Sequence, residues 1–233
     1  MSRADDRLIV ALDDGELSAA LRMARRLRGL VRTVKIGSIL FTACGPVAVR
    51  RLRALGFSVM LDLKFFDIPT TVELSCRSAA WLGVSLLTVH ASGGREMLAA
   101  AVRGARGGAR RWARPKVLAV TVLTSIGAGT PAAIRARVLA LAREARTAGC
   151  DGIVASAREA DAVRRVVGPN GLVVCPGIRP AGSARGDQAR VATPADALGR
   201  GADRLVVGRP ITEARDPRAA ARAVLREMEA CAC

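Results

Sequence analysis

The stretch VMLDLKFFDIPTTVELSCRSAAWLGVSLLTV, residues 59–89, holds one complete unit of the pattern that decides the fold. Its two ends, 59–63 and 86–89, are short apolar runs of the kind that form buried strands. Between them lies a longer segment of helical period, for which Thr70, with Glu73 three residues later, is the expected N-cap. A strand, a helix and a second strand in succession predict a βαβ unit with parallel strands.

The same alternation continues along the whole chain. Candidate strands lie at residues 8–12, 34–36, 59–63, 86–89, 117–123, 152–155, 172–175 and 204–207. The segments between them are rich in Ala, Leu and Arg, and two of them begin at threonines that precede prolines, Thr130 and Thr193. No linker or low-complexity stretch divides the 233 residues, so we expect a single domain over residues 1–233.

Polar side chains stand at the C-terminal end of almost every candidate strand. They are Asp13, Lys35, Asp62 with Lys64, His90, Thr124, Ser156, Arg179 and Arg209. In a (β/α)8 barrel this rim carries the active site, whereas an open doubly wound sheet concentrates its functional groups at one switch point. Eight strands with this distribution predict an α/β protein that forms a single closed (β/α)8 TIM barrel.

Composition narrows the class of protein further. No apolar run is long enough for a membrane span, and MSRADDRLIV at the N-terminus lacks the order of a signal peptide, so we expect a cytoplasmic protein without membrane contact. Six cysteines without CxxC spacing indicate neither a zinc site nor a disulfide framework. The net charge of +17 is spread over helix faces, with only 3% aromatic residues, which favours a solvated surface over a nucleic-acid partner.

Lysine is rare in this chain, because only Lys35, Lys64 and Lys116 are lysines among 37 basic residues. Because arginine is used almost everywhere, each remaining lysine is a candidate for a position where a guanidinium group cannot replace it. The reason is either its shape or the need to give up a proton, which arginine does not do in proteins. Two of the three lysines fall in the polar rim.

Asp62 and Lys64 are two residues apart at a strand end, so their side chains are expected on the same side of the sheet. An isolated pair of this kind is more often an ordinary buried ion pair. Asp67 follows just before Pro69, where packing gives little reason for a second acid, and Lys35 ends another strand at the same rim. Such an array suits a reaction in which a carboxylate leaves a carbon and Lys64 supplies the replacing proton.

The segment DLKFFDIPTTV, residues 62–72, closely resembles the DxKxxDIPxT signature of the orotidine 5'-phosphate decarboxylase family. The resemblance covers nearly the whole chain, with ALD at Asp13, VKIG at Lys35, TVHASGG at His90, VTVLTS at Thr124, DGIV at Asp151, PGIRP at Arg179, GDQARVATP at Gln188 and VVGRPIT at Arg209. The chain departs from the usual pattern at Phe66, where histidine is common, and at Thr70, where asparagine is common.

The resemblance implies conversion of orotidine 5'-monophosphate to uridine 5'-monophosphate in pyrimidine biosynthesis, without a cofactor or a metal. Lys35, Asp62, Lys64 and Asp67 would form the catalytic tetrad, with Lys64 as proton donor. Asp67 and Thr71 would be contributed across a subunit interface, so the resemblance also implies a homodimer with shared active sites.

The same resemblance assigns substrate contacts. Asp13 would hold the ribose hydroxyls together with Lys35, and Thr124 and Ser125 would recognise the pyrimidine edge. Gln188 would bridge the phosphate and the pyrimidine when residues 180–187 close as a lid. As an alternative, Thr124 and Ser125 serve only as turn or helix caps, and residues 180–187 form an ordinary surface loop.

A phosphate site is expected from the residues themselves at Arg179, Gly208 and Arg209, because loops after the seventh and eighth strands of such barrels commonly bind phosphate. Glycine lets backbone amides approach an anion, and arginine offers a fork of donors. His90, the sole histidine, is interpreted as a structural residue rather than a general base. Ser156 has no acid or histidine placed to activate it as a nucleophile.

Three other functions remain open. A magnesium-dependent sugar-phosphate decarboxylase or aldolase of the related barrel group has a similar DxKxxD core, but usually carries a glutamate where this chain has Lys35. A basic nucleic-acid-binding protein would account for the charge. A phosphate-binding barrel that has lost catalysis is disfavoured, because the four candidate catalytic residues are all present.

Overall fold

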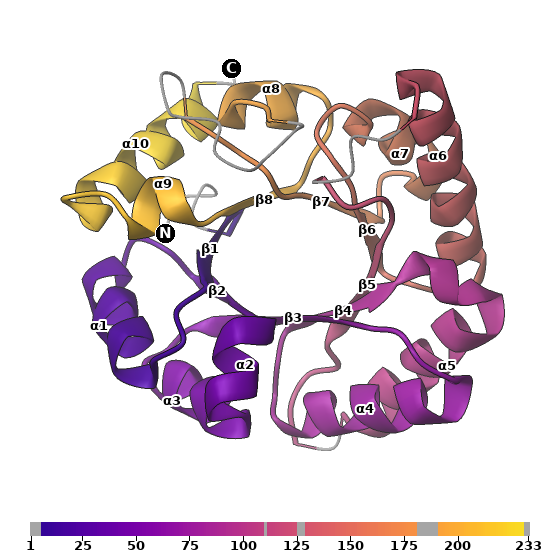
Figure 1. Ribbon diagram of the computed structural model, residues 1–233, viewed down its shortest axis with the longest axis horizontal. Coiled ribbons are helices and arrows are strands. Elements are labelled where there is room, and N and C mark those ends of the chain that lie inside the picture. Colours follow the sequence, from indigo (N-terminus) through magenta and orange to yellow (C-terminus); the bar gives the residue numbers. More distant parts are fainter. Residues whose placement is uncertain (1–5, 110, 125–128, 181–190, 231–233) are drawn as a thin grey trace.

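The computed structural model describes residues 6–109, 111–124, 129–180 and 191–230. Eight parallel strands follow one another in chain order around a closed barrel, in which β1 pairs with both β2 and β8 (Figure 1). The strands are β1 (Leu8–Leu12), β2 (Thr33–Gly37), β3 (Ser58–Phe65), β4 (Leu86–His90), β5 (Lys116–Val120), β6 (Gly152–Val154), β7 (Leu172–Cys175) and β8 (Arg204–Val207). The predicted (β/α)8 barrel is confirmed, while the extent of the domain, residues 1–233, stays a prediction.

The helices form a ring around the outside of the barrel (Figure 1). They are α1 (Leu17–Leu27), α2 (Ser38–Cys44), α3 (Pro46–Ala54), α4 (Pro69–Trp81), a 3-10 turn η1 (Ala91–Gly93), α5 (Gly94–Gly107), α6 (Pro131–Thr147), α7 (Ala160–Val167), α8 (Pro194–Gly199), α9 (Arg209–Thr212) and α10 (Pro217–Glu229). Within the described ranges, no helix combines the length and the apolar character that crossing a membrane requires.

The strands are apolar because both of their faces are covered. In β1, Leu8, Val10 and Leu12 pack outwards against the helices, whereas Ile9 and Ala11 belong to a separate apolar cluster inside the barrel. Alternation of side chains along a strand produces these two layers, and in a parallel barrel both are buried. The inner cluster fills the middle of the barrel, and Lys35 and Asp62 follow it on the inward faces of β2 and β3, at the C-terminal mouth.

Most predicted strand ends lie within two residues of the observed ends, and two predictions differ more. Thr130 and Thr193 cap α6 and α8, accepting hydrogen bonds from backbone amides three residues later at 3.2 and 3.1 Å. Thr70 does not cap α4, because that helix begins at Pro69, whose fixed φ suits a first helical position. The fifth strand ends at Val120 rather than at residue 123, since Val120 pairs with Val154, the last residue of β6.

The helices α4 and α5 approach each other unusually closely at Gly104. A Cβ atom built on Gly104 would lie 2.1 Å from the backbone oxygen of Glu73, a separation that no side chain tolerates. The carboxylate of Glu73 also pairs with Arg103 of α5 at 3.0 Å. Glycine is therefore required here for contact between the two helix backbones.

We expect Gly104→Ala to lower the free energy of unfolding by about 1 to 3 kcal/mol, because the added methyl group overpacks this contact. The gain in helix propensity of about 1 kcal/mol that alanine brings works in the opposite direction. Urea unfolding monitored by circular dichroism measures the difference.

Gly107→Ala is the matched control. Its added Cβ would meet nothing closer than Arg77 Nε, at 3.5 Å, which is an ordinary contact. This variant should be as stable as the parent or slightly more stable. Equal destabilisation by both substitutions would contradict the close packing of α4 on α5.

Candidate active site

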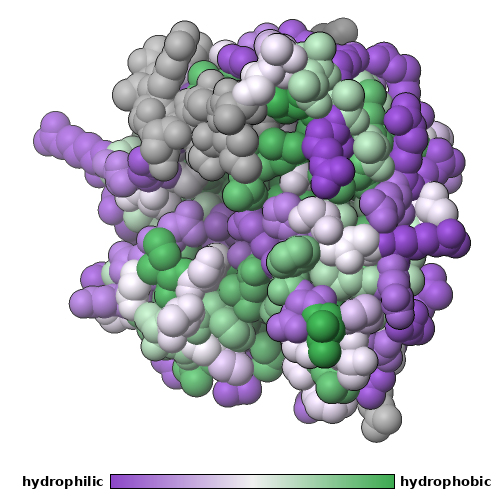
Figure 2. Space-filling model, turned by 45° about the vertical axis from the view of Figure 1, so that its right-hand side comes forward, coloured by the Kyte–Doolittle hydropathy of each residue, from purple (hydrophilic) through white to green (hydrophobic). Residues whose placement is uncertain are grey.

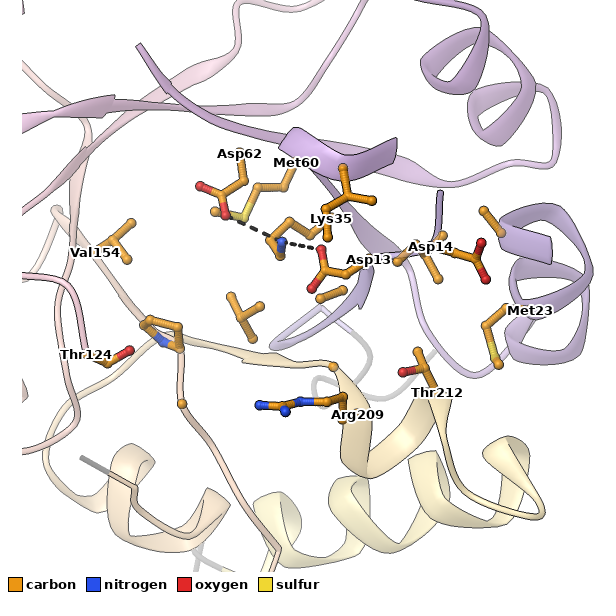
Figure 3. Close-up of a pocket in the computed structure, with 18 of the residues that line it drawn as sticks. Asp13, Asp14, Met23, Lys35, Met60, Asp62, Thr124, Val154, Arg209 and Thr212 are labelled. Atoms are coloured by element: carbon orange, nitrogen blue, oxygen red, sulfur yellow. Dashed lines mark hydrogen bonds and ion pairs between the residues drawn. The ribbon is translucent and has the colours of Figure 1, made fainter. Parts of the chain in front are cut away.

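A cavity of about 1000 Å³ opens at the C-terminal mouth of the barrel. Side chains from β2 and β3 and from the segments after β1, β5, β7 and β8 line it (Figure 3). Most of the polar residues predicted for the rim reach this one space. The carboxyl ends of parallel strands meet at the same end of a barrel, which explains why residues far apart in sequence converge here.

Charged side chains of alternating sign form a connected network in the cavity. Lys35 Nζ lies 2.9 Å from Asp13 Oδ1 and 3.5 Å from Asp62 Oδ2 (Figure 3), and Lys64 Nζ lies 3.0 Å from Asp62 Oδ1. The middle members are the most buried, since Lys35 is 8% and Asp62 is 9% exposed. The structure thus brings Lys35, Asp62 and Lys64 together as predicted, with Asp13 as the fourth member.

The inward position of Lys35 and Asp62 follows from strand alternation. Val34 and Ile36 of β2 pack outwards among the helices, which turns Lys35 into the barrel. Met60 belongs to the inner apolar cluster, and Asp62 follows two residues later on the same face of β3. Both charged groups therefore stand directly above a dry, apolar layer, on the side that opens to the cavity.

Lys64 reaches the network through an irregular backbone. The register between β3 and β4 shifts between Leu61 and Phe65, and Lys64 has a φ of 49°, in the left-handed region that side chains other than glycine rarely adopt. The Thr88 hydroxyl accepts a hydrogen bond from the Lys64 backbone amide at 2.9 Å and donates one to Asp62 Oδ1 at 2.9 Å. Sequence reasoning missed Thr88, because a threonine inside a strand gives no functional signal.

The network controls the charge of Asp62. Burial by itself raises the pKa of this carboxyl, but the positive charges of Lys35 and Lys64, with hydrogen bonds from Lys64 and Thr88, lower it below the usual value. Asp62 is therefore ionised at neutral pH. Two ammonium groups and two carboxylates balance one another without an external counterion.

Gly37 makes room for the first ion pair. A Cβ atom on this residue would lie 3.1 Å from both Asp13 Oδ1 and Lys35 Nζ, closer than nearly all real contacts of that kind. Gly37 is the register partner of Asp62, so it stands beside the centre of the network. The VKIG motif contained this glycine, but its role becomes visible only when the three strands are assembled.

Arg179 and Arg209 face the same cavity from the ends of β7 and β8. Arg179 is 9% exposed, and burial, followed by the positive charge of Arg209, lowers its pKa. Figure 3 shows Arg209 extending into the cavity, on the side opposite Asp62. Two guanidinium groups held near each other, with Gly208 beside them, form an arrangement suited to an anion such as phosphate.

The remaining predicted residues are distributed unevenly. Thr124 is buried and lines the wall of the cavity far from Asp13 (Figure 3). Ser125, Gln188 and most of the predicted lid, residues 181–187, lie outside the described residues. Asp67 and Thr71 are exposed and do not belong to the described lining of the cavity.

Asp67 therefore stands apart from the other three tetrad residues within this chain. Its carboxylate accepts a hydrogen bond from the Ile68 amide at 2.7 Å. Its catalytic role, like that of Thr71, stays a prediction that depends on a second subunit.

His90 and Ser156 have the local partners expected of structural residues. His90 Nδ1 lies 2.7 Å from the Ser92 hydroxyl, and burial, then the charge of Lys64, lowers its pKa. The buried Ser156 hydroxyl accepts a hydrogen bond from the Arg158 amide at 3.3 Å.

The carboxylates of the cavity are poorly placed to bind a metal ion, because Asp13 and Asp62 already pair with ammonium groups. The described residues contain no cluster of three or more His, Cys, Asp or Glu that could hold a metal ion.

Comparison with known proteins gives consistent matches over nearly the full chain. A curated protein named Orotidine 5'-phosphate decarboxylase from Anaeromyxobacter dehalogenans is 53% identical over 228 residues, covering 95% of this chain and 98% of that protein. Its namesake from Moorella thermoacetica is 48% identical over 235 residues, covering 97% and 93%. The crystal structure of Orotidine 5'-phosphate decarboxylase from Lactobacillus acidophilus matches with a TM-score of 0.83 at 36% identity, covering 96% and 99% of the two chains.

The chain also matches a model of a whole protein family. The model described as "Orotidine 5'-phosphate decarboxylase / HUMPS family" matches residues 6–224, a range that contains every strand of the barrel and the whole charged network. With this match and relatives near half identity, the chain belongs to the orotidine 5'-phosphate decarboxylase / HUMPS family.

Proposed function

We propose that this chain decarboxylates orotidine 5'-monophosphate to uridine 5'-monophosphate in pyrimidine biosynthesis, with Lys64 as proton donor. The observation that carries the proposal is the alternating network of Asp13, Lys35, Asp62 and Lys64 in a cavity that also contains Arg179 and Arg209. The names of the most similar relatives agree with this activity.

The cavity has a place for each part of the substrate. The phosphate binds at Arg179, Gly208 and Arg209, whose donors suit its oxygens. The ribose hydroxyls bind to Asp13 and Lys35, and the pyrimidine extends towards Lys64 and Thr124. Ser125 and Gln188 are proposed to complete the contacts with the base and the phosphate. Binding the phosphate, which does not react, supplies energy that orients the distant ring.

The reaction then follows from the charges around the ring. The substrate carboxylate lies against ionised Asp62, so repulsion is relieved as the C–C bond breaks and neutral carbon dioxide leaves. The electron pair stays on the ring carbon, where the Lys64 ammonium stabilises it and then transfers its proton to form the product. The neutral amine regains a proton from water. Every charge used in these steps belongs to the protein or the substrate.

We further propose that the active protein is a cytoplasmic homodimer with shared sites. Asp67 stands between two strongly exposed apolar side chains, Phe66 at 62% and Ile68 at 66%, and Leu74 of α4 is also exposed. Exposed apolar side chains gathered in one segment are typical of a protein interface. Docking of a second subunit on this segment would carry Asp67 and Thr71 to the neighbouring active site.

The purified protein is expected to consume orotidine monophosphate in the presence of EDTA, as measured by ultraviolet absorbance. Lys64→Arg keeps the charge but removes a usable acid, so kcat/KM should fall at least about a hundredfold. Circular dichroism should show an unchanged fold.

Lys116→Arg is the matched control, since Lys116 is the exposed first residue of β5 and does not line the cavity. Its activity should equal that of the parent. Near-normal turnover by Lys64→Arg would refute the role of Lys64 as proton donor. Activity that EDTA abolishes would instead favour the magnesium-dependent alternative.

The position of Lys64 can be tested without an activity assay, because His90 is the only histidine. Burial and the Lys64 charge both disfavour the imidazolium ion, so the pKa of His90 should lie below the reference value of about 6.5. Proton NMR titration of the imidazole signal should show this pKa rising in Lys64→Gln. It should remain below the reference value, because burial persists. An unchanged pKa would mean that Lys64 points away from the barrel mouth.

Shared sites predict complementation between two inactive variants. Mixing Asp67→Ala with Lys64→Ala in equal amounts should restore about a quarter of parent activity, since half of randomly formed dimers would contain one intact site. Mass spectrometry of differently tagged subunits verifies that exchange has occurred. Verified mixed dimers without activity would exclude an interface that brings Asp67 to Lys64.

A further inference from the structure

A second cavity lies outside the barrel, between α6 and α7, and the proposed decarboxylation does not use it. Its volume is about 740 Å³. Four arginines line it, and we call this space the arginine groove. They are Arg135, Arg143 and Arg146 from α6 and Arg165 from α7. Hydrophilic side chains cover much of the molecular surface in Figure 2.

The three arginines of α6 share one face of the helix. Arg135, Leu139, Arg143 and Arg146 follow each other at intervals of four, four and three residues, which places them in a single row. At 1.5 Å of rise per residue, the row from Arg135 to Arg146 is about 16 Å long. A ligand that contacts all of it must carry several anionic groups, since one phosphate is too short.

Three of the four guanidinium groups are held in place by the groove itself. Arg135 and Arg165 both donate to Asp161 Oδ2, at 3.3 and 3.1 Å, and Arg146 donates to the Val166 carbonyl at 2.5 Å. A guanidinium has five N–H donors, and each of these recorded contacts uses one of them. The groups are thus oriented in advance yet keep donors for a ligand, which reduces the entropy lost on binding.

Positive charge exceeds negative charge among the described residues that line the groove. In the described ranges, Asp161 is the acid recorded as pairing with these four arginines. Glu144 of α6 points to the other side, where its carboxylate lies near Gly94 of α5. A surface stabilised by its own charges alternates their signs along the helix face, whereas like charges in one row repel. An anionic ligand would remove this cost.

We propose that the arginine groove binds linear polyphosphate, an unbranched chain of phosphate groups. Arginine forks match phosphate oxygens, and the row of donors matches a ligand with charges repeated along its length. The described lining includes Leu139, Ala162 and Val166 but no aromatic side chain, so it provides no platform on which nucleobases stack. The proposal does not depend on the decarboxylase activity.

The test measures binding of inorganic polyphosphate to the full chain by isothermal titration calorimetry. An ionic strength of about 0.15 M screens exposed charges more than about 8 Å apart. We expect saturable binding of polyphosphate and no detectable binding of orthophosphate. In the double variant Arg143→Gln/Arg146→Gln, binding should weaken about tenfold or more, because each lost charged hydrogen bond contributes to affinity.

The matched control is Arg50→Gln/Arg137→Gln, which removes the same charge from two exposed positions outside the groove. It should bind polyphosphate within about twofold of the parent if contacts in the groove, rather than the overall charge, carry the affinity. Both double variants should keep the parent's melting temperature and decarboxylase activity.

Three results would overturn the proposal. The first is no polyphosphate binding by the parent, and the second is equal loss in both double variants, which would mean diffuse attraction by net charge. The third is tighter binding of a single-stranded oligonucleotide than of polyphosphate, with the same dependence on Arg143 and Arg146. That outcome would identify the groove as a nucleic-acid site.

Discussion

The whole site depends on one buried carboxylate that two ammonium groups share. Asp62 lies 3.0 Å from Lys64 and 3.5 Å from Lys35, and the Thr88 hydroxyl supplies a further contact. Without the lysines, burial would favour the neutral acid, and without the acid, two neighbouring ammonium groups would repel each other. The charges therefore stabilise one another as a set, and the set is positioned before any substrate arrives.

The barrel can hold these charged side chains because each strand runs from a buried apolar layer to a cavity that is open to solvent. The inner cluster, including Ile9, Met60 and Leu118, excludes water below the network. Two residues after Met60 on β3, Asp62 lines the open cavity. A charge at this boundary is desolvated enough to interact strongly, yet remains accessible to a polar ligand.

Sequence patterns predicted the eight strands, the closed barrel and the meeting of Lys35, Asp62 and Lys64. These features follow from periodicity and strand ends, which a linear sequence contains. The shift in register at Lys64 and the bridging role of Thr88 were missed, because both depend on how β3 and β4 align. The clustering of arginines was missed for a similar reason. Arg165 joins the row of α6 only after α6 and α7 pack side by side, so charge that is scattered in the sequence converges in space.

The left-handed backbone at Lys64 has a consequence for how the molecule can be divided. A residue in this conformation costs energy, and it persists because neighbouring strands hold it. In an open sheet the distortion could relax by fraying at an edge, but a closed sheet has no edge. A cut between β3 and β4 would thus lose the geometry of the ammonium group even if the strands still formed, because Thr88 of β4 accepts the hydrogen bond from the Lys64 amide. The position of this ammonium group and the pairing of β3 with β4 are inseparable, which limits where the barrel can be divided into exchangeable modules.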